Sequence, residues 1–343
     1  MTTYKDSGVD ISAAEAAKKE MAKSIDTGDK RVLNKHGAFA SLVQGSFPGF
    51  KHPVLVLKTE EPGSKQKLAF ENKKVRSICF DTINHLINDI VVMGATPLFV
   101  QDAVICGKLE KEVVTAIVKG FADACRAQGC VLTGGETSEQ PGVLSPGTYI
   151  LTASIVGVVE EEKIIDGQQI KIGDTVLAVA SNGLHTNGYT LVRKIMAEHP
   201  DILKEKLGKK SFMDAILEPH QCYYQSLKVL FGKPSVHGLA HITGGGIAGN
   251  LNRILPKEMN AEINLSKLKV LPIFSLLQKF GSVPDADMLR TYNMGVGLTV
   301  VCDPSAAADI KKHFSKEKMD CYEIGSIAKG KQEVVYTESV RWQ

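Results

Sequence analysis

The sequence predicts an α/β protein built from two domains. Its 343 residues exceed the roughly 250 to 300 residues at which a single hydrophobic core stops growing. Apolar residues alternate along the chain between stretches with the spacing of strands and stretches with the spacing of helices. A strand, a glycine-containing polar loop and a helix also follow one another at residues 175–198, an order that often places an anion at the start of a helix.

The first domain is expected at residues 1–165. Ala13 to Lys23 is polar and amphipathic, a glycine- and histidine-containing loop follows at 34–37, and this start of the chain is expected to be mobile or ligand-dependent. Val54 to Lys58 is expected to be a strand, followed by a polar loop to Lys65 and a long helix that Pro97 ends. The apolar positions of this helix recur at helical spacing: Ile83, Leu86, Ile87, Ile90 and Val91.

Further strands alternate with one helix before the domain boundary. Leu98 to Ile105 is expected to be a strand and Glu110 to Gln128 a helix with one apolar face. Val131 to Thr133 and Tyr149 to Val159 are expected to be strands around a glycine-rich turn. The charged, turn-rich segment at 160–174 places the boundary next to residue 166.

The second domain is expected at residues 166–343. It begins with the strand Thr175 to Ala180, the loop Ser181 to Gly188 and the helix Tyr189 to Glu198. Similar glycine-containing loops lie beside apolar segments at 241–246 and 293–297. No fixed-period repeat is present.

Composition excludes several classes of function. The chain has 41 basic and 38 acidic residues, a net charge of +3, so it offers no basic field for nucleic acid or an anionic membrane. Its 7 cysteines include no Cys-x-x-Cys pair, which argues against a disulfide framework and a zinc site. No apolar run reaches the roughly 18 to 20 residues that span a bilayer. A soluble protein of the reducing cytoplasm is expected.

Four polar clusters are candidates for chemistry. Thr59 to Lys65 combines carboxylates, a glycine, a hydroxyl and a lysine, which suits a metal and a phosphate but also a charged hairpin tip. Asn88 and Asp89 lie in an apolar helix, and Asp102 is expected at the end of the next strand. Buried carboxylates are costly unless paired or bound to metal, whereas a carboxylate on the helix surface needs no partner.

The other two clusters are loops. Gly134 to Gly142 holds two carboxylates and two hydroxyls, which suits Mg²⁺ as well as a solvated turn. Ser181 to Gly188 crowds hydroxyl, amide and imidazole groups into one turn before a helix, which favours a functional site. The remaining histidines considered are expected at the surface or on helix faces, without a role: His52, His85, His199 and His220.

Taken in order, these clusters resemble the aminoimidazole ribonucleotide (AIR) synthetase family, the phosphoribosylformylglycinamidine cyclo-ligases, from about residue 4 to residue 327. The matching motifs are Tyr4 to Asp10, Gly37-Ala38-Phe39, Asn88-Asp89, Gly94 to Leu98, Gly107-Lys108-Leu109, Gly134 to Gly142, Val156 to Val159, Ile164 to Gly167, His185 to Gly188, Leu239 to Gly246 and Arg290 to Gly297.

The resemblance implies an N-terminal half-barrel domain that pairs with a second subunit, forming a homodimer, and a C-terminal α/β domain. It implies a ligase of purine biosynthesis that uses ATP and Mg²⁺ to convert formylglycinamidine ribonucleotide to AIR. In the implied chemistry, ATP phosphorylates the formyl oxygen, and an amidine nitrogen then attacks the activated carbon and expels phosphate.

The resemblance also implies roles for individual residues. The metal ligands would be Glu60, Asp89, Asp102 and Glu136. The nucleotide would contact Gly63, Ser64, Lys65, Asn88, Asp89, Gly134, Gly135 and Glu136, with Lys65 on phosphate. His185, Thr186 and Asn187 would face the reacting groups. The substrate would be held by Thr243, Gly244, Gly245, Gly246 and Asn293.

The loop at residues 60–65 departs from the family, which usually has Asp-Gly-Val-Gly-Thr-Lys there. Glu60 keeps the carboxylate but is one C–C bond longer, Glu61 replaces a conformationally free glycine, and Pro62 has no N–H for phosphate. Two other readings stay open. One is a kinase or selenophosphate synthetase of the same superfamily, and the other is a catalytically inactive nucleotide-binding protein.

Overall fold

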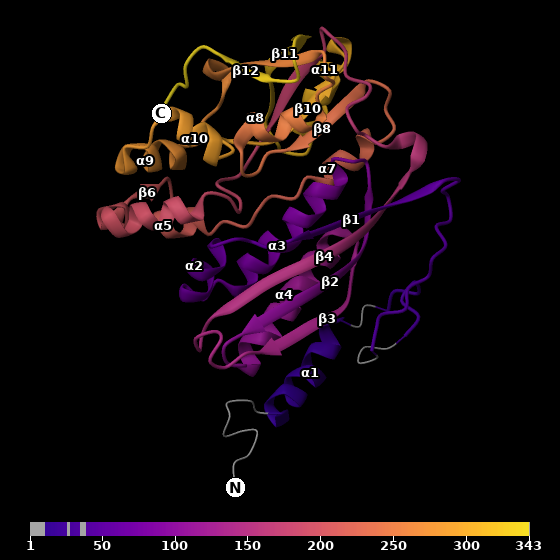
Figure 1. The fold of residues 1–343 in the computed structure, drawn as a ribbon, viewed down its shortest axis with the longest axis vertical. Coiled ribbons are helices and arrows are strands. Elements are labelled where there is room, and N and C mark those ends of the chain that lie inside the picture. Colours follow the sequence, from indigo (N-terminus) through magenta and orange to yellow (C-terminus); the bar gives the residue numbers. More distant parts are fainter. Residues whose placement is uncertain (1–10, 26–27, 35–38, 343) are drawn as a thin grey trace. The chain divides into compact units, whose positions relative to one another are not determined.

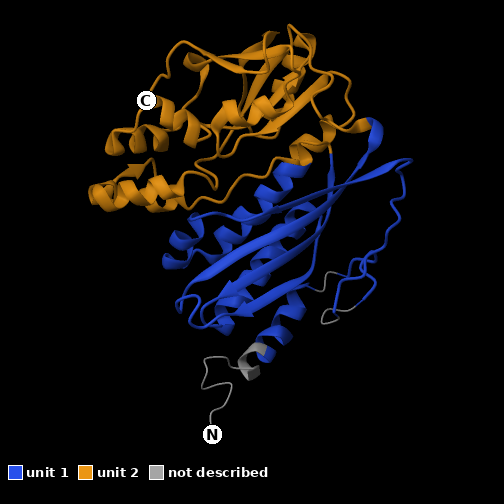
Figure 2. Ribbon diagram, viewed as in Figure 1, with its two compact units in different colours: residues 1–90, 95–162 blue, residues 91–94, 163–343 orange. Residues whose placement is uncertain are grey.

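The structure, a computed structural model, describes residues 11–25, 28–34 and 39–342. The Tyr4 to Asp10 motif, Gly37 and Ala38 lie outside these residues. The chain forms two compact units, residues 1–90 with 95–162 and residues 91–94 with 163–343 (Figure 2). From the sequence, the boundary was expected next to residue 166.

A four-stranded sheet forms the centre of unit 1, in the order β1-β4-β2-β3 (Figure 1). The strands are β1 (Pro53–Glu60), β2 (Thr96–Cys106), β3 (Val131–Glu139) and β4 (Tyr149–Glu160). β4 pairs antiparallel with β1 and β2, whereas β2 and β3 are parallel. β1 is therefore an edge strand, with its other backbone edge unpaired within this sheet.

The described part of this unit contains four α-helices: α1 (Ile11–Ile25), α2 (Lys65–Glu71), α3 (Val75–Val91) and α4 (Lys111–Gln128). α3 and α4 pack together, and the Cys79 thiol of α3 lies 3.4 Å from the Ile117 carbonyl of α4. α1 packs against α4. On β1, the side chains of Leu55 and Leu57 are exposed while the intervening residues are half-buried, so this face of the strand presents apolar side chains to solvent.

Two expectations for unit 1 were wrong. Pro97 does not end the long helix, because α3 already ends at Val91 and Pro97 lies in β2. Gly94 has a left-handed φ of 82°, and the Ala95 N–H donates to the Ile90 carbonyl at 3.4 Å, a helix-ending pattern that glycine favours.

The Gly134 to Gly142 segment is also not a loop throughout, because β3 continues to Glu139. Glycine is depleted in strands, and this segment begins with Gly134 and Gly135. Parallel pairing with β2, from Gln101 opposite Gly134 to Cys106 opposite Glu139, extends the strand nevertheless. Asp102 consequently lies in the middle of β2 and not at its end.

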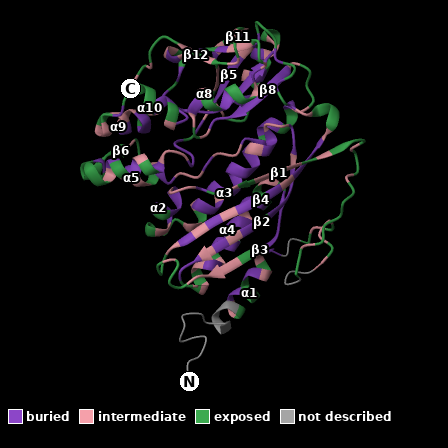
Figure 3. Cartoon of the chain, in the orientation of Figure 1, coloured by how far each residue is buried: buried purple, intermediate pink, exposed green. Residues whose placement is uncertain are grey.

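A six-stranded sheet forms the core of unit 2, in the order β12-β9-β11-β5-β10-β8. Its strands are β5 (Thr175–Ala180), β8 (Val236–His241), β9 (Met259–Asn264), β10 (Val296–Cys302), β11 (Cys321–Lys329) and β12 (Val334–Thr337). β8 is buried along its whole length (Figure 3). All neighbours in the sheet are antiparallel except β9 and β12.

Helices and short strands complete unit 2. They are α5 (Tyr189–Glu198), β6 (Lys206–Leu207), β7 (Lys210–Ser211), α6 (Phe212–Ile216), α7 (Tyr224–Leu227), α8 (Gly246–Leu251), α9 (Pro272–Gly281), α10 (Asp285–Thr291) and α11 (Ala307–Lys316). β5 and α5 have the bounds expected from the sequence, and the mixed α/β fold class is confirmed. No helix within the described ranges is long and apolar enough to cross a membrane.

Candidate functional site

Two of the predicted metal ligands approach a single cation in unit 1. Lys58 and Glu60 are two residues apart on β1, so their side chains leave the same face of the strand. The Lys58 ammonium lies 2.9 Å from Glu60 Oε2 and 3.1 Å from Asp89 Oδ2 of α3. Burial lowers the pKa of Lys58, but the hydrogen bond to Glu60 and the charge of Asp89 outweigh it, and the pKa is raised. Glu60 and Asp89 therefore converge on one positive charge.

Neighbouring residues frame this pair. His85, one turn before Asp89, lies on the helix as one of the two expectations had it; it is buried, and its Nε2 lies 3.8 Å from Asp89 Oδ2. Asn88 is also buried. Glu61, which follows Glu60, is exposed, and its N–H donates to Glu60 Oε1 at 3.2 Å.

The other two predicted metal ligands lie on the central strands. Asp102 is buried, and burial raises its pKa to about 7. Gly135 lies opposite it on β3, where an added Cβ would be 2.4 Å from Asp102 Oδ1, so only glycine fits there. Glu136 is exposed, and its Oε1 accepts from the Thr137 N–H at 2.9 Å. Within the described residues, no three of the four predicted ligands hold their oxygens within 4.8 Å of one another.

Lys65 lies in the core of unit 1. Its ammonium is 2.7 Å from Asp81 Oδ1, and both side chains have no exposed area. Ser64 precedes α2, and Gly63 has a left-handed φ of 61°. The loop thus reaches Lys65 by a turn that directs the lysine inward, toward Asp81, and not to solvent, where a phosphate was expected to bind.

A cavity of about 310 Å³ lies beside this loop in unit 1. Its lining includes Ser64, Phe70 and Tyr149. The two aromatic rings are 5.0 Å apart and tilted by 33°. Volume and aromatic lining are typical of a small-molecule site. Elsewhere in the unit, Gly134 of β3 is buried, and an added Cβ would lie 3.5 Å from Ser41 Oγ.

Three loops of unit 2 meet at one end of its sheet. Ala180, the last residue of β5, lies opposite Val296, the first residue of β10. His241, the last residue of β8, lies opposite Leu298 of β10. The segments at 181–188, 242–246 and 293–295 therefore leave the sheet side by side.

Asn293 connects two of these loops. Its Oδ1 accepts from the Ser181 hydroxyl at 3.0 Å and the Gly295 N–H at 2.9 Å, and its Nδ2 donates to the Gly183 carbonyl at 2.9 Å. The side chain is buried. Its polar atoms thus hold the loops in place, which differs from the substrate contact expected from the sequence.

The glycine-rich loop after β8 is also held from within. The Gly245 N–H donates to the Arg290 carbonyl and the Gly246 N–H to the Thr243 carbonyl, both at 3.1 Å. Two of the N–H groups expected to bind phosphate are therefore engaged within the chain.

Asn250 was not predicted from the sequence as a site residue, yet it supports the loop at 243–246. Its Nδ2 donates to the carbonyls of Thr243, Gly244 and Gly246 at 2.8 to 3.3 Å, and its Oδ1 accepts from the Thr243 hydroxyl at 3.1 Å. Asn187 lies near, since an added Cβ on Gly244 would be 3.2 Å from Asn187 Oδ1. Two predicted groups, the reacting-site loop and the substrate loop, are thus adjacent.

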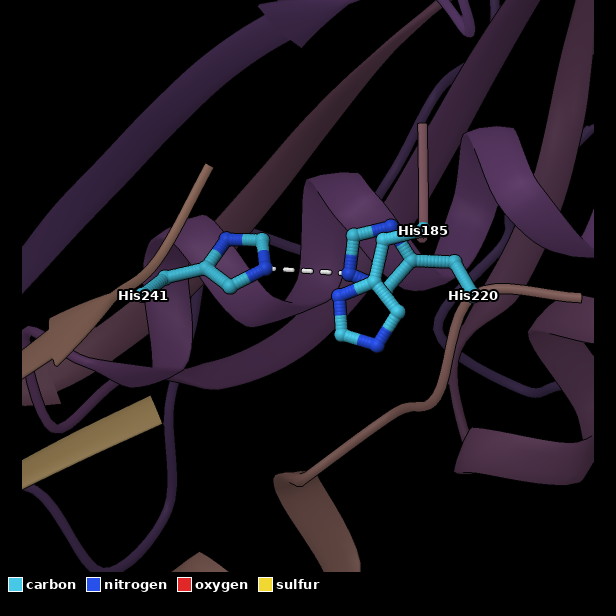
Figure 4. A group of neighbouring side chains, drawn as sticks. All are labelled: His185, His220 and His241. Atoms are coloured by element: carbon cyan, nitrogen blue, oxygen red, sulfur yellow. Dashed lines mark hydrogen bonds between the residues drawn. The ribbon is translucent and has the colours of Figure 1, made fainter. Parts of the chain in front are cut away.

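Three buried histidines stand in contact at this end of the sheet (Figure 4). His220 Nε2 lies 3.0 Å from His241 Nε2, and the rings of His220 and His185 stack with centroids 3.9 Å apart. Thr186 Oγ1 is 3.4 Å from His220 Nδ1. The expectation that His220 lies at the surface or on a helix face was wrong, because it is buried in a loop, and neither His220 nor His241 was predicted as a site residue.

His185 adopts a left-handed φ of 61°, a conformation that is uncommon for residues other than glycine. Such backbone persists only where the surroundings enforce it, and it is common at functional sites. Thr186, the next residue, is buried. The local backbone thus agrees with the functional importance that the residue types suggested.

Comparison with known proteins identifies the family. Residues 51–159 match the AIR synthase related protein N-terminal domain, and residues 171–338 match the C-terminal domain. A phosphoribosylformylglycinamidine cyclo-ligase of Acetivibrio thermocellus is 39% identical over 97% of this chain and 98% of its own.

Solved structures with low identity share the fold. Thiamine-monophosphate kinase from Stenotrophomonas maltophilia K279a is 16% identical, with a TM-score of 0.67 over 96% of this chain and 98% of its own. Hydrogenase maturation protein HypE in complex with ATP is 16% identical, with a TM-score of 0.67 over 96% of this chain and 92% of its own. Only the cyclo-ligase among these three proteins combines high sequence identity with coverage of nearly the whole chain. The chain therefore belongs to the phosphoribosylformylglycinamidine cyclo-ligase family.

Proposed function

We propose that the protein is an ATP-dependent ligase that converts formylglycinamidine ribonucleotide and ATP to 5-aminoimidazole ribonucleotide, ADP and phosphate, a step of purine biosynthesis. The observation that carries this proposal is the 39% identity to a cyclo-ligase over both units. The kinase shares the fold at 16% identity, which is no evidence for its activity here.

The reaction needs activation of a poor leaving group. The γ-phosphoryl group of ATP moves to the formyl oxygen, and ADP leaves. The amidine nitrogen then attacks the formyl carbon, the C–O bond breaks, phosphate leaves and a proton is lost from nitrogen. Because the attack is intramolecular, holding the two groups together supplies much of the rate.

We assign the reacting groups to the His185 loop of unit 2. The hydroxyl of Thr186 and the amide of Asn187 can donate or accept hydrogen bonds near the formyl and amidine atoms, and the imidazole of His185 can exchange a proton there when it holds no metal ion. Asn293 supports this assignment, because it fixes the start of the loop through Ser181 and Gly183. The glycine loop at 243–246 is proposed to hold the substrate phosphate, for which the Gly245 and Gly246 N–H groups would have to leave the Arg290 and Thr243 carbonyls.

We assign Mg²⁺ to Glu60 and Asp89. Both carboxylates already approach one cation, the Lys58 ammonium, and hard oxygen ligands are those that Mg²⁺ prefers. When bound with ATP, the ion would offset the charge of the triphosphate. Asp102 and Glu136 remain weaker candidates, since their side chains do not join this pair.

We place the nucleotide in unit 1. HypE binds ATP on the same fold, and the cavity lined by Phe70 and Tyr149 is suited to a planar base. The loop with Gly63 and Ser64 lies beside this cavity and would meet the phosphates. For Lys65 to join them, its ammonium would have to leave Asp81.

We also propose a homodimer formed through the sheet of unit 1. Leu55 and Leu57 are exposed on an edge strand, where a second copy can cover them. A two-fold dimer buries the same patch twice, which suits a self-complementary apolar face.

The direct test is turnover. The purified chain is incubated with ATP, Mg²⁺ and formylglycinamidine ribonucleotide, and the products are identified by mass. ATP-dependent loss of one water from the nucleotide substrate, with one ADP per product, is expected. Phosphorylation of thiamine monophosphate instead would assign the chain to the kinases, and no ATP turnover with either substrate would reject the proposal.

A further inference from the structure

We infer that His185, His220 and His241 form a binding site for a divalent transition-metal ion of the zinc class. This goes beyond the proposed function, which uses Mg²⁺ at carboxylates of unit 1. The cysteine pattern argued against a zinc site in the sequence, but the ligands here are imidazoles from three separate segments of unit 2.

The separations of the nitrogens suit such an ion. Each of the three histidines offers a ring nitrogen, and these three atoms lie within 4.8 Å of one another. Two nitrogens that are each about 2.1 Å from an ion stand about 3.0 to 3.4 Å apart at angles between square and tetrahedral. The Nε2 atoms of His220 and His241 are already 3.0 Å apart.

His185 must move to complete the site. Ligands at about 2.1 Å from one ion stand about 3.4 Å apart at the tetrahedral angle, so a separation at the 4.8 Å limit would have to close by roughly 1.4 Å. The His185 ring also has to turn out of its stack on His220, where the planes differ by 18°. We expect rotation about the side-chain bonds of His185 to supply both movements.

The surroundings already orient His220 for this role. Thr186 Oγ1 lies 3.4 Å from His220 Nδ1, so a hydrogen bond from Nδ1–H to the hydroxyl leaves Nε2 for the ion. Metal-bound histidines commonly have such an outer partner, which fixes the ring and its tautomer.

Gly297 makes room for the same cluster. An added Cβ there would lie 1.9 Å from Tyr223 Oη and 2.9 Å from His185 Cε1. Tyr223 in turn donates to the Ala180 carbonyl at 2.9 Å. The absence of a side chain at Gly297 thus lets the His185 ring and Tyr223 pack over β10.

The ligand set selects the kind of metal. Imidazole nitrogens suit Zn²⁺, Ni²⁺, Cu²⁺ and Co²⁺, whereas Mg²⁺ prefers oxygen. Three histidines leave a fourth position open for water or an anion, as in many catalytic zinc sites. The side chains are only 2%, 1% and 5% exposed at positions 185, 220 and 241, so the ion would be largely shielded from solvent.

The test measures metal binding directly. The full chain is stripped with a chelator and titrated with Co²⁺, followed by its visible absorption bands, and then with Zn²⁺ in competition. One equivalent of Co²⁺, displaced by one equivalent of Zn²⁺, is expected. His220→Gln should weaken binding at least about tenfold. Since no activity is measured, failure here leaves the proposed ligase reaction intact.

Controls separate this site from chance binding. His199→Gln alters an exposed histidine and should leave the affinity unchanged, and so should Cys222→Ser, which removes the nearest thiol in sequence. Thermal unfolding checks that each variant folds. If His220→Gln does not fold, the same titration is done with His241→Gln. Absence of stoichiometric binding, unchanged affinity in the folded variant, or loss of binding in Cys222→Ser would overturn the inference.

Discussion

Asp81→Ala should destabilise unit 1 strongly, because it leaves the Lys65 ammonium buried without its counter-charge. The two side chains form a 2.7 Å ion pair with no exposed area on either partner. Removing one member of a buried pair costs about 3 to 5 kcal/mol, because the remaining charge loses its partner while staying out of water. For a unit of this size, the melting temperature should fall by roughly 6 to 20 °C.

A double variant separates charge burial from packing. Replacing both residues by apolar ones, Lys65→Met with Asp81→Leu, should recover most of the lost stability, since no uncompensated charge remains. The exposed pair Lys67 and Glu71, at 2.6 Å, is the matched control, and Glu71→Ala should cost less than about 1 kcal/mol.

Urea unfolding of wild type, single and double variants gives the free energies of unfolding. If Asp81→Ala lost less than about 1 kcal/mol, or if the double variant were as unstable as the single one, the reasoning about a buried charge pair would be refuted. The folded double variant also tests Lys65 in function, because a raised KM for ATP would support its proposed phosphate contact.

Three further substitutions test the proposed function. Glu60→Gln should raise the Mg²⁺ concentration for half-maximal rate and cut turnover, while Glu61→Gln should do little; a silent Glu60→Gln would remove it from the metal site. His185→Ala should lower kcat by about a hundredfold with little change in the KM for ATP, and an unchanged kcat would exclude it from the chemistry. Leu57→Glu, at a side chain 70% exposed, should give a monomer in light scattering while Ile172→Glu, at one 59% exposed, should not; a persisting dimer would place the interface elsewhere.

Local patterns predicted much of the fold. β5 and α5 have the expected bounds because an apolar run and an amphipathic run are separated by an unmistakable glycine-rich loop. α4 begins at Lys111, one residue after the expected start, and its apolar face is regular. It ends at Gln128 as expected, because Gly129 adopts a left-handed conformation that ends the helix.

Pairing between distant segments decided what local patterns could not. The segment after Thr133 begins with Gly134 and Gly135, which disfavour a strand, yet it continues β3 because β2 offers a parallel partner. Pro97 is compatible with a helix end in sequence, but Gly94 ends the helix first and leaves Pro97 at the start of a strand. Neither outcome can be read from the segment alone.

The candidate site shows the same division. His185, Thr186 and Asn187 stood out because polar groups crowd one short loop. His220 had no such signal, because its partners His185 and His241 are brought to it only by the sheet of unit 2. Asn250 could not be predicted either, because the three carbonyls that it binds come together only in the folded loop.

Asp102 should make unit 1 less stable as the pH rises from about 4 to about 7. Burial raises its pKa from 3.8 to about 7, so the folded state holds the proton more tightly than the unfolded state. The stability that this shift contributes is fully present below the pKa of the unfolded state and is lost as the pH rises through the pKa of the folded state. Above that pKa, Asp102 makes no further change to the stability with pH.

The size of this effect follows from the shift. Roughly three pKa units correspond to about 4 kcal/mol, of which about 3 kcal/mol should be lost between pH 5 and pH 8. Asp102→Asn keeps the shape of the side chain but cannot ionise. From pH 5 to pH 8 the wild type should therefore lose about 3 kcal/mol of unfolding free energy relative to the variant. Urea unfolding at both pH values measures it, and groups shared by the two proteins cancel. A difference independent of pH would mean that Asp102 is already ionised in the folded state at pH 5, as a hydrated or cation-bound carboxylate would be.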